Sequence, residues 1–232
     1  DYNAYSDFIS SEGVPVFYAR VDHVSVPLAQ EGTGQVVVDF TPEPLTQDVS
    51  FVFHIEKTAD VVVDSLTAEI SGIPSTMELT TGLILAQKTY KLLFRPTYAA
   101  LPSAADSASA EALRCEASVN IPGIVRSHTE DMVTGPGILQ IAIYTHYDYE
   151  EEGTQRKAAK VFHAGINLYH TLKERKSLQW DEEENGYRQA SRSITVEIGS
   201  PLNIDKDGIL NGGSTSTGLD QWIPGETFEI EV

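Results

Sequence analysis

Short segments in which apolar and polar residues alternate recur along the whole chain. In Val49–Glu56, the apolar residues Phe51, Phe53 and Ile55 occupy alternate positions, and polar residues fill most of the positions between them. Thr227–Val232 repeats this pattern at the end of the chain. A period of two places the apolar side chains on one face of a pleated strand and the polar ones on the other. The pattern therefore predicts strands with one buried face.

Turn residues such as Glu31–Gly34 and Pro42–Pro44, and a charged turn at Asp181–Gly186, separate the apolar segments, as is typical of short strands in an all-β protein. Tyr169–Lys176 fits either a short helix or an extension of the strand before it. The expected strands are Val14–Leu28, Gln35–Thr41, Asp48–Lys57, Val61–Ser71, Thr89–Pro96, Leu113–Ile121, Ile138–Tyr149, Lys157–Leu168, Ile194–Ile198 and Thr227–Val232. Sheets of this kind pack face to face, so the fold class expected is an all-β sandwich.

The chain is long enough for one large β domain or two of ordinary size, and turn signals divide its strands into two groups. Residues 1–13 are polar and aromatic without a period and are expected to form an N-terminal tether. Ser71–Ser75 contains glycine and proline and is expected to close a first group of strands. The predicted domains are 14–86 and 87–232, since 232 residues can hold two sandwiches of ordinary size.

The charge of the chain excludes one class of partner. Its formal net charge is −18, with 34 acidic residues against 16 basic ones, so binding to nucleic acid is not expected. Cys115 is the single cysteine, which excludes an internal disulfide, and it shares the apolar face of its segment with Val119 and Ile121. It is expected to be a buried thiol rather than a nucleophile. No apolar run reaches the ~20 residues needed to span a bilayer as a helix.

Few residues form a pattern that indicates chemistry. Asn203, Asp205 and Asp207 alternate as in the first half of a calcium loop and precede Gly208, but Ser214 occupies the place of the bidentate glutamate. A turn joining two strands is the interpretation favoured for this segment. No spacing indicates a catalytic serine, a paired-carboxylate centre or another metal site, so an enzyme is not expected.

Aromatic residues offer an alternative function in ligand binding. Trp180 and Trp222 lie beside expected loops and could form part of a platform that binds carbohydrate. Tyr144 has the opposite parity from Tyr147 and Tyr149, so these tyrosines do not form one exposed row. Packing in the core or at its rim is the interpretation favoured for the tyrosines.

Val61–Gly82 resembles a stretch of the fimbrillin-like proteins of Bacteroides-type bacteria, in which a strand is followed by Ser-Gly and then by a hydrophobic residue near Thr-Gly. Val36–Phe40, Val49–Phe53 and Trp222–Glu226 fit the same layout. The chain is most similar to the branch that contains the anchoring subunits of minor fimbriae.

The resemblance implies two tandem transthyretin-like domains and export to the cell surface. It implies a lipidated cysteine upstream of Asp1 that attaches the protein to the outer membrane, and no cofactor. Members of the family anchor or assemble fimbriae, whose subunits are joined by donation of a β-strand, so fimbrial subunits are the partners implied. Backbone hydrogen bonds and alternating side chains hold such a donated strand at a sheet edge.

The edge that captures a partner strand is expected near Phe228, Ile230 and Val232. Polymerising relatives lose an N-terminal strand by cleavage after a basic residue in a loop. Here Arg20 is the only Lys or Arg before Lys57 and falls within an expected strand, which favours an anchor over a stalk subunit. The alternative function is a surface module that binds carbohydrate or a host protein.

Overall fold

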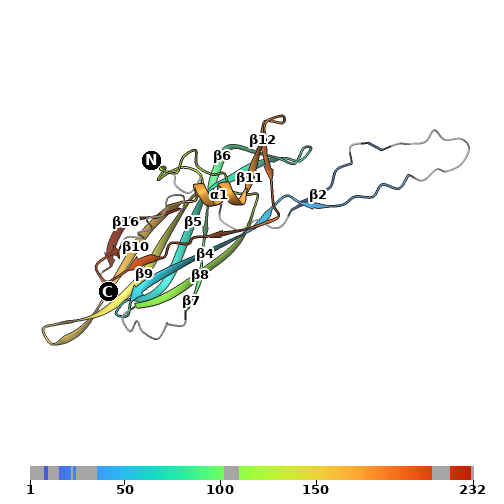
Figure 1. Ribbon diagram of the computed structural model, residues 1–232. Helices are drawn as coiled ribbons and strands as arrows, with labels where there is room; N and C mark the ends of the chain where they lie inside the picture. Colours follow the sequence, from blue (N-terminus) through green and yellow to red (C-terminus); the bar gives the residue numbers. More distant parts are fainter. Residues whose placement is uncertain are drawn as a thin grey trace, which may run out of the picture.

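The computed structural model describes residues 8–9, 16–21, 23–24, 36–101, 110–210 and 220–230. Nearly all of its regular structure is β, as the alternation predicted (Figure 1). The elements are β1 Phe8–Ile9, β2 Phe17–Tyr18, β3 Glu43–Pro44, β4 Gln47–Thr58, β5 Val62–Glu78, β6 Leu83–Phe94, β7 Thr97–Ala100, β8 Ala110–Ile121, β9 Ile138–Glu151, β10 Thr154–Asn167, α1 Tyr169–Arg175, β11 Leu178–Asp181, β12 Gly186–Gln189, β13 Ser193–Glu197, β14 Leu202–Ile204, β15 Ile209–Leu210 and β16 Trp222–Ile230.

Two sheets form the body of the molecule. The larger has the strand order β11-β12-β6-β5-β9-β10-β16, with β1 pairing alongside β6. The smaller has the order β15-β14-β4-β8-β7, with β13 also pairing with β4. β13 and β14 run parallel to β4, one after the other along its length, whereas β8 pairs with β4 antiparallel.

The hydrophobic core lies between the two sheets. Phe51 of β4 stacks on Phe94 of β6 with ring centroids 5.1 Å apart, and Phe53 meets Trp222 of β16 edge-on at 5.8 Å. Each pair joins a strand of the small sheet to a strand of the large sheet, so the sheets pack face to face. Val49, Phe51, Phe53 and Ile55 are all fully buried, which confirms the face predicted for this strand.

The division predicted at residues 86 and 87 is not found, because that point lies inside β6. β5, from the predicted first domain, pairs with β9 from the second, and β4 pairs with β8 in the same way. One core cluster contains residues from both sides of the boundary. The described residues therefore form one packed sandwich rather than two separate cores.

Ser71–Ser75 does not close a group of strands, since it lies within β5. The register of β5 against β6 shifts between Ser71 and Ile73, and Gly72 adopts a φ of +90°. The Gly72 carbonyl accepts a hydrogen bond from the amide of Val125 at 2.9 Å. A Cβ at Gly72 would lie 2.5 Å from the Val125 carbonyl oxygen, so a β-bulge and a close backbone contact explain the glycine.

Residues at the start of the chain differ most from the prediction. Of the expected strands Val14–Leu28 and Gln35–Thr41, only Phe17–Tyr18 forms a strand among the described residues. Within the predicted tether, Phe8–Ile9 pairs in parallel with β6, while the rest of 1–13 lies outside the described residues. Tyr169–Arg175 forms a helix rather than extending β10.

Candidate functional site

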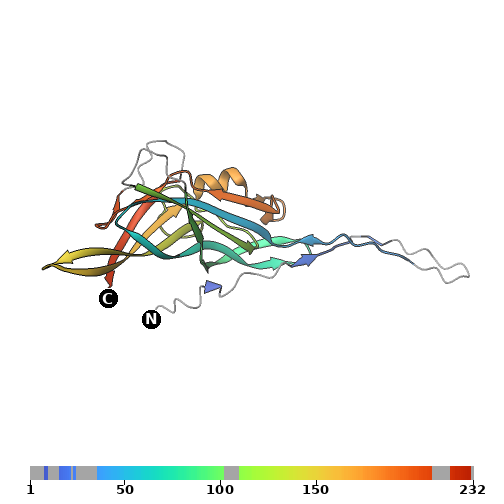
Figure 2. The same ribbon diagram turned by 90° about the horizontal axis from the view of Figure 1, so that it is seen from below.

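An arm formed by residues 16–24 and 36–44 extends away from the sandwich, apart from residue 22, which is not described (Figures 1 and 2). It leaves the body at the end opposite the tip of the β9–β10 hairpin. Several of its large apolar side chains are exposed, with Phe17 at 60% and Val37 at 72% of their full accessible area. The exposed apolar residues of the arm are Val16, Phe17, Val21, Val24, Val36, Val37 and Phe40.

The base of the arm is held to the body by defined contacts. Within the arm, Phe17 and Tyr18 pair with Pro44 and Glu43, and from the body the Leu45 amide donates to the Val16 carbonyl at 2.7 Å. Arg20 donates to the Thr80 carbonyl in the turn between β5 and β6. The arm therefore leaves the sandwich from a fixed position, although its own apolar side chains are not buried there.

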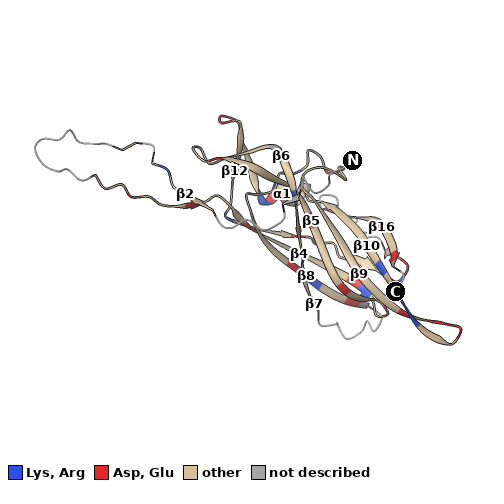
Figure 3. Cartoon of the chain, turned by 180° about the vertical axis from the view of Figure 1, so that it is seen from behind, with Lys and Arg blue, Asp and Glu red and all other residues tan. Residues whose placement is uncertain are grey.

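The described residues of the arm include a few charged side chains beside its exposed apolar ones. Among its described residues only Arg20, Asp39 and Glu43 are formally charged, and the arm is correspondingly uncoloured over most of its described length in Figure 3. Asp and Glu also lie on the body and at hairpin tips such as Glu150–Glu152. Exposed apolar side chains gathered on one segment are typical of a surface that another molecule covers.

β16 lies at the edge of the large sheet, next to β10. Its register places Phe228 opposite Val161 and Ile230 opposite Ala159. Among the described strands, β16 pairs with β10 alone, so its other side is unpaired there. Val232, the third residue predicted for a partner-binding edge, lies outside the described residues.

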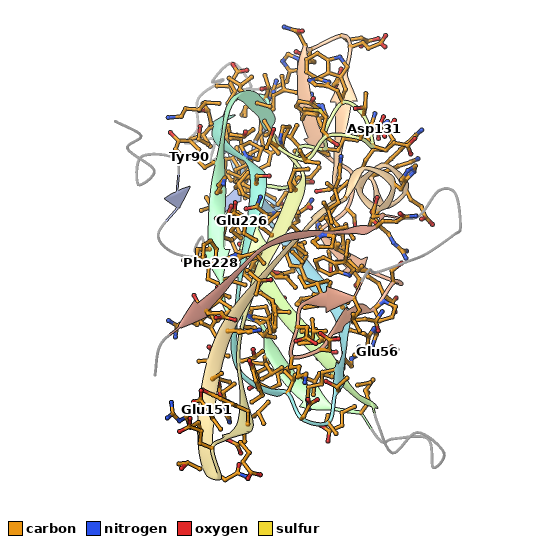
Figure 4. All side chains as sticks on the ribbon, turned by 90° about the vertical axis from the view of Figure 1, so that its left-hand side faces the viewer. Glu56, Tyr90, Asp131, Glu151, Glu226 and Phe228 are labelled. Carbon is orange, nitrogen blue, oxygen red and sulfur yellow. The ribbon has the colours of Figure 1, made fainter. Side chains whose placement is uncertain are left out.

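Phe228 is on the outer face of the sheet rather than in the core. It pairs with Val161, which in turn pairs with Tyr144, so the three side chains share one face. Phe162, the neighbour of Val161, is buried in the core on the opposite face. Phe228 is 51% exposed and its ring meets His163 edge-on at 5.5 Å; Figure 4 labels it on β16. The prediction that the final strand buries its apolar face as β4 does is therefore wrong at Phe228.

The calcium candidate forms a tight turn between β14 and β15. One Asp205 carboxylate oxygen accepts the amides of Asp207 and Gly208 at 2.7 and 2.8 Å, and the Asp205 amide donates to the Gly208 carbonyl at 3.0 Å. This confirms the turn favoured for Asn203–Gly208. In the part of the chain that the structure describes, no group of three or more His, Cys, Asp or Glu residues could hold a metal ion.

Trp180 and Trp222 have opposite environments. Trp222 is 4% exposed, packs on Phe53 and donates its indole N–H to the Ser200 carbonyl at 2.9 Å, so it cannot be part of a surface platform. Trp180 is 47% exposed and meets Tyr187 edge-on at 4.9 Å. A pocket of about 400 Å³ lies beside this pair, between the β11–β12 hairpin and the start of β6.

The hairpin that carries Trp180 is fixed by its own turn. Asp181 accepts Arg188 Nε at 2.8 Å and the amides of Glu183 and Glu184 at 3.2 Å. The hydrogen bond from Arg188, followed by that from the Glu184 amide, lowers the pKa of Asp181 below its usual value. The charged turn predicted at Asp181–Gly186 is confirmed, and in the hairpin that it closes Trp180 pairs with Tyr187.

None of the described helices is both long and apolar enough to cross a membrane. Comparison of the chain with models of protein families, with curated proteins and with solved structures found no match. The resemblance of Val61–Gly82 to fimbrillin-like proteins thus stays a prediction.

Sequence reasoning missed the arm, although a signal was present. Val36–Val38 places three β-branched residues in succession, so the run has no polar face for solvent and does not fit a half-buried strand. The pocket beside Trp180 was missed for another reason. Its walls come from segments around residues 84–89, 125–136 and 180–187, and no local pattern indicates that these meet.

Proposed function

We propose that this chain is a non-enzymatic surface protein that anchors or assembles fimbriae by β-strand complementation. In this proposal a lipidated cysteine upstream of Asp1 attaches it to the outer membrane, facing outward, and its partners are fimbrial subunits. The resemblance at Val61–Gly82 suggests the family. The two tandem transthyretin-like domains that it implies are replaced in the proposal by the single sandwich seen in the described residues.

The observation that carries the proposal is the arm. An extended backbone with exposed Val16, Phe17, Val36, Val37 and Phe40 can add to the sheet of a partner, and its apolar side chains would be buried in that complex. The side of β16 that no described strand pairs with provides a second place where an extended segment can pair, as expected for a protein at a junction between subunits.

The arm can be tested without disturbing the core. Val37→Ser with Phe40→Ser removes exposed apolar surface, so the melting temperature should stay within a few degrees of that of the parent protein. Fimbrial subunits that co-purify with the parent chain from intact cell envelopes should no longer co-purify with this variant. A matched control, Val133→Ser with Leu210→Ser, removes exposed apolar side chains from the body and should co-purify as the parent does.

A parallel variant, Phe228→Ser, tests the edge at β16. If Phe228→Ser abolishes co-purification of the partner and the arm variant does not, the partner binds at the β16 edge rather than at the arm. Capture unchanged in both the arm and the Phe228 variants, or no fimbrial subunit in the parent pulldown, would contradict the proposal.

A second candidate function, binding of carbohydrate or of a host protein, is favoured by one observation. Trp180 presents a half-exposed ring beside a pocket and is held by a hairpin whose turn is fixed by Asp181 and Arg188. Trp222 does not contribute, because it is buried.

A further inference from the structure

We infer that the pocket beside Trp180 binds the ring of a neutral hexopyranose. This inference gives the second candidate function a site and a ligand class, and it does not depend on fimbrial assembly. The ligand would stack an apolar sugar face on the indole of Trp180 and direct its hydroxyl groups toward the polar side chains that line the pocket.

The aromatic side of the pocket is a row across three strands. Trp180 pairs with Tyr187 in the β11–β12 hairpin, and Tyr187 pairs with Ile84 of β6, so the three side chains lie on one face. Ile84 is buried and supports Tyr187, whereas Trp180 at the outer end is 47% exposed. The Trp180 indole is therefore supported by Tyr187 and Ile84 on one side and is exposed on the other. An exposed aromatic ring of this kind can stack against the C–H groups of a sugar ring.

The polar side of the pocket has groups that are free to bind a ligand. Thr89, His128 and Asn185 line it, and within the described part of the chain none of their side chains makes a hydrogen bond or an ion pair. Hydroxyl, imidazole and amide groups supply both donors and acceptors, which match the hydroxyl groups of a sugar. An apolar wall with a few polar groups that face the same space is the usual composition of a small-ligand site.

Charge selects among sugars. The described lining residues include no Asp, Glu, Lys or Arg, although 22% of the chain is charged. An anionic sugar would find no cationic partner in the pocket and would meet a protein of net charge −18. A volume of about 400 Å³ is near the lower end of the ~300–1,000 Å³ typical of small-ligand sites, which suits a short saccharide.

Intrinsic fluorescence of the whole chain provides the test, because Trp180 is exposed and the other tryptophan is buried. The probes are the methyl glycosides of glucose, galactose and mannose and N-acetylglucosamine, each titrated to about 50 mM, with glucuronic acid as the anionic comparison. At least one neutral probe should shift the emission and release heat in calorimetry, and glucuronic acid should do neither.

Four variants, compared by calorimetry because two of them lack the Trp180 fluorophore, separate loss of the binding site from loss of the fold. Trp180→Ala should weaken binding of the neutral probe by about tenfold or more, and Trp180→Phe by less, since it keeps an aromatic ring. Asn185→Gly removes the amide yet tolerates the φ of +54° at this position, and it should also weaken binding. Tyr144→Ala removes an exposed aromatic ring from β9 and should bind as the parent does.

The inference is overturned if no neutral probe binds, if glucuronic acid binds at least as tightly, or if binding survives in Trp180→Ala and Asn185→Gly alike. Loss of a protein partner in Trp180→Ala, with no saccharide bound by the parent, would assign the pocket to protein recognition instead. Trp180→Ala should co-purify with fimbrial subunits as the parent does. A failure of this inference can therefore be distinguished from a failure of the fimbrial proposal.

Discussion

Cys115 illustrates how burial acts on a single residue. It is fully buried on β8 opposite Phe53, and desolvation of the thiolate raises its pKa from 9.0 to about 12. The thiol is therefore protonated across the physiological range, which disfavours its reaction as a nucleophile. This agrees with the buried thiol predicted from its parity with Val119 and Ile121.

The raised pKa predicts a dependence of stability on pH. Above pH 9 the unfolded chain loses the Cys115 proton while the folded chain keeps it, so the free energy of unfolding falls as pH rises toward 12. The expected contribution is about 1.4 kcal/mol per pH unit above pH 9. Urea unfolding between pH 8 and pH 10.5 should give a steeper loss for the parent than for Cys115→Ala; equal slopes would contradict the prediction.

At the scale of the element, short turns fix where strands begin and end. Asp205 closes the β14–β15 turn with two hydrogen bonds to backbone amides, whereas Asp207 in the same turn is exposed. The acidic pattern that resembles half a calcium loop is thus explained by turn geometry.

Substitution of the two aspartates should therefore have unequal effects. Asp205→Ala should lower the free energy of unfolding by about 1 kcal/mol, because two amides lose their acceptor, and Asp207→Ala should change it by less than about 0.5 kcal/mol. Thermal unfolding with and without calcium measures both points. A melting temperature that rises with calcium in the parent but not in Asp205→Ala would contradict this explanation and indicate a calcium site at the turn.

At the scale of the whole molecule, the pairing of distant strands decides what can fold alone. β4 depends on β8 for its antiparallel partner, and β5 depends on β9. A fragment of residues 1–86 would keep β4 and β5 but lose both partners and the opposite wall of the core.

Fragment 1–86 is accordingly expected to remain unfolded, with no cooperative thermal transition by circular dichroism. Fragment 45–232 lacks the arm but keeps the core cluster, and it should unfold cooperatively. A cooperative transition in fragment 1–86 would restore the two-domain division predicted from the sequence. Loss of cooperativity in fragment 45–232 would show that the base contacts of Tyr18 and Arg20 are needed for the fold.

The sequence by itself determined the local structure of the body. Alternation in Asp48–Lys57, Leu113–Ile121 and Ile138–Tyr149 predicted β4, β8 and β9 and the buried faces of β4 and β8, because the pleat of a strand ties each side chain to one face of a sheet. Turn residues in Asn203–Gly208 and Asp181–Gly186 likewise predicted their turns, since these conformations depend on the residues within them.

Only the tertiary structure decided which strands pair and which segments remain outside the sandwich. Val36–Phe40 has the composition of a strand, yet no sheet in the described residues includes it, and Phe228 lies outside the core because β16 pairs with β10 at the rim. The pocket beside Trp180 likewise exists because three distant segments meet. Long-range pairing is set by the packing of the whole chain, and that information is not contained in any local pattern.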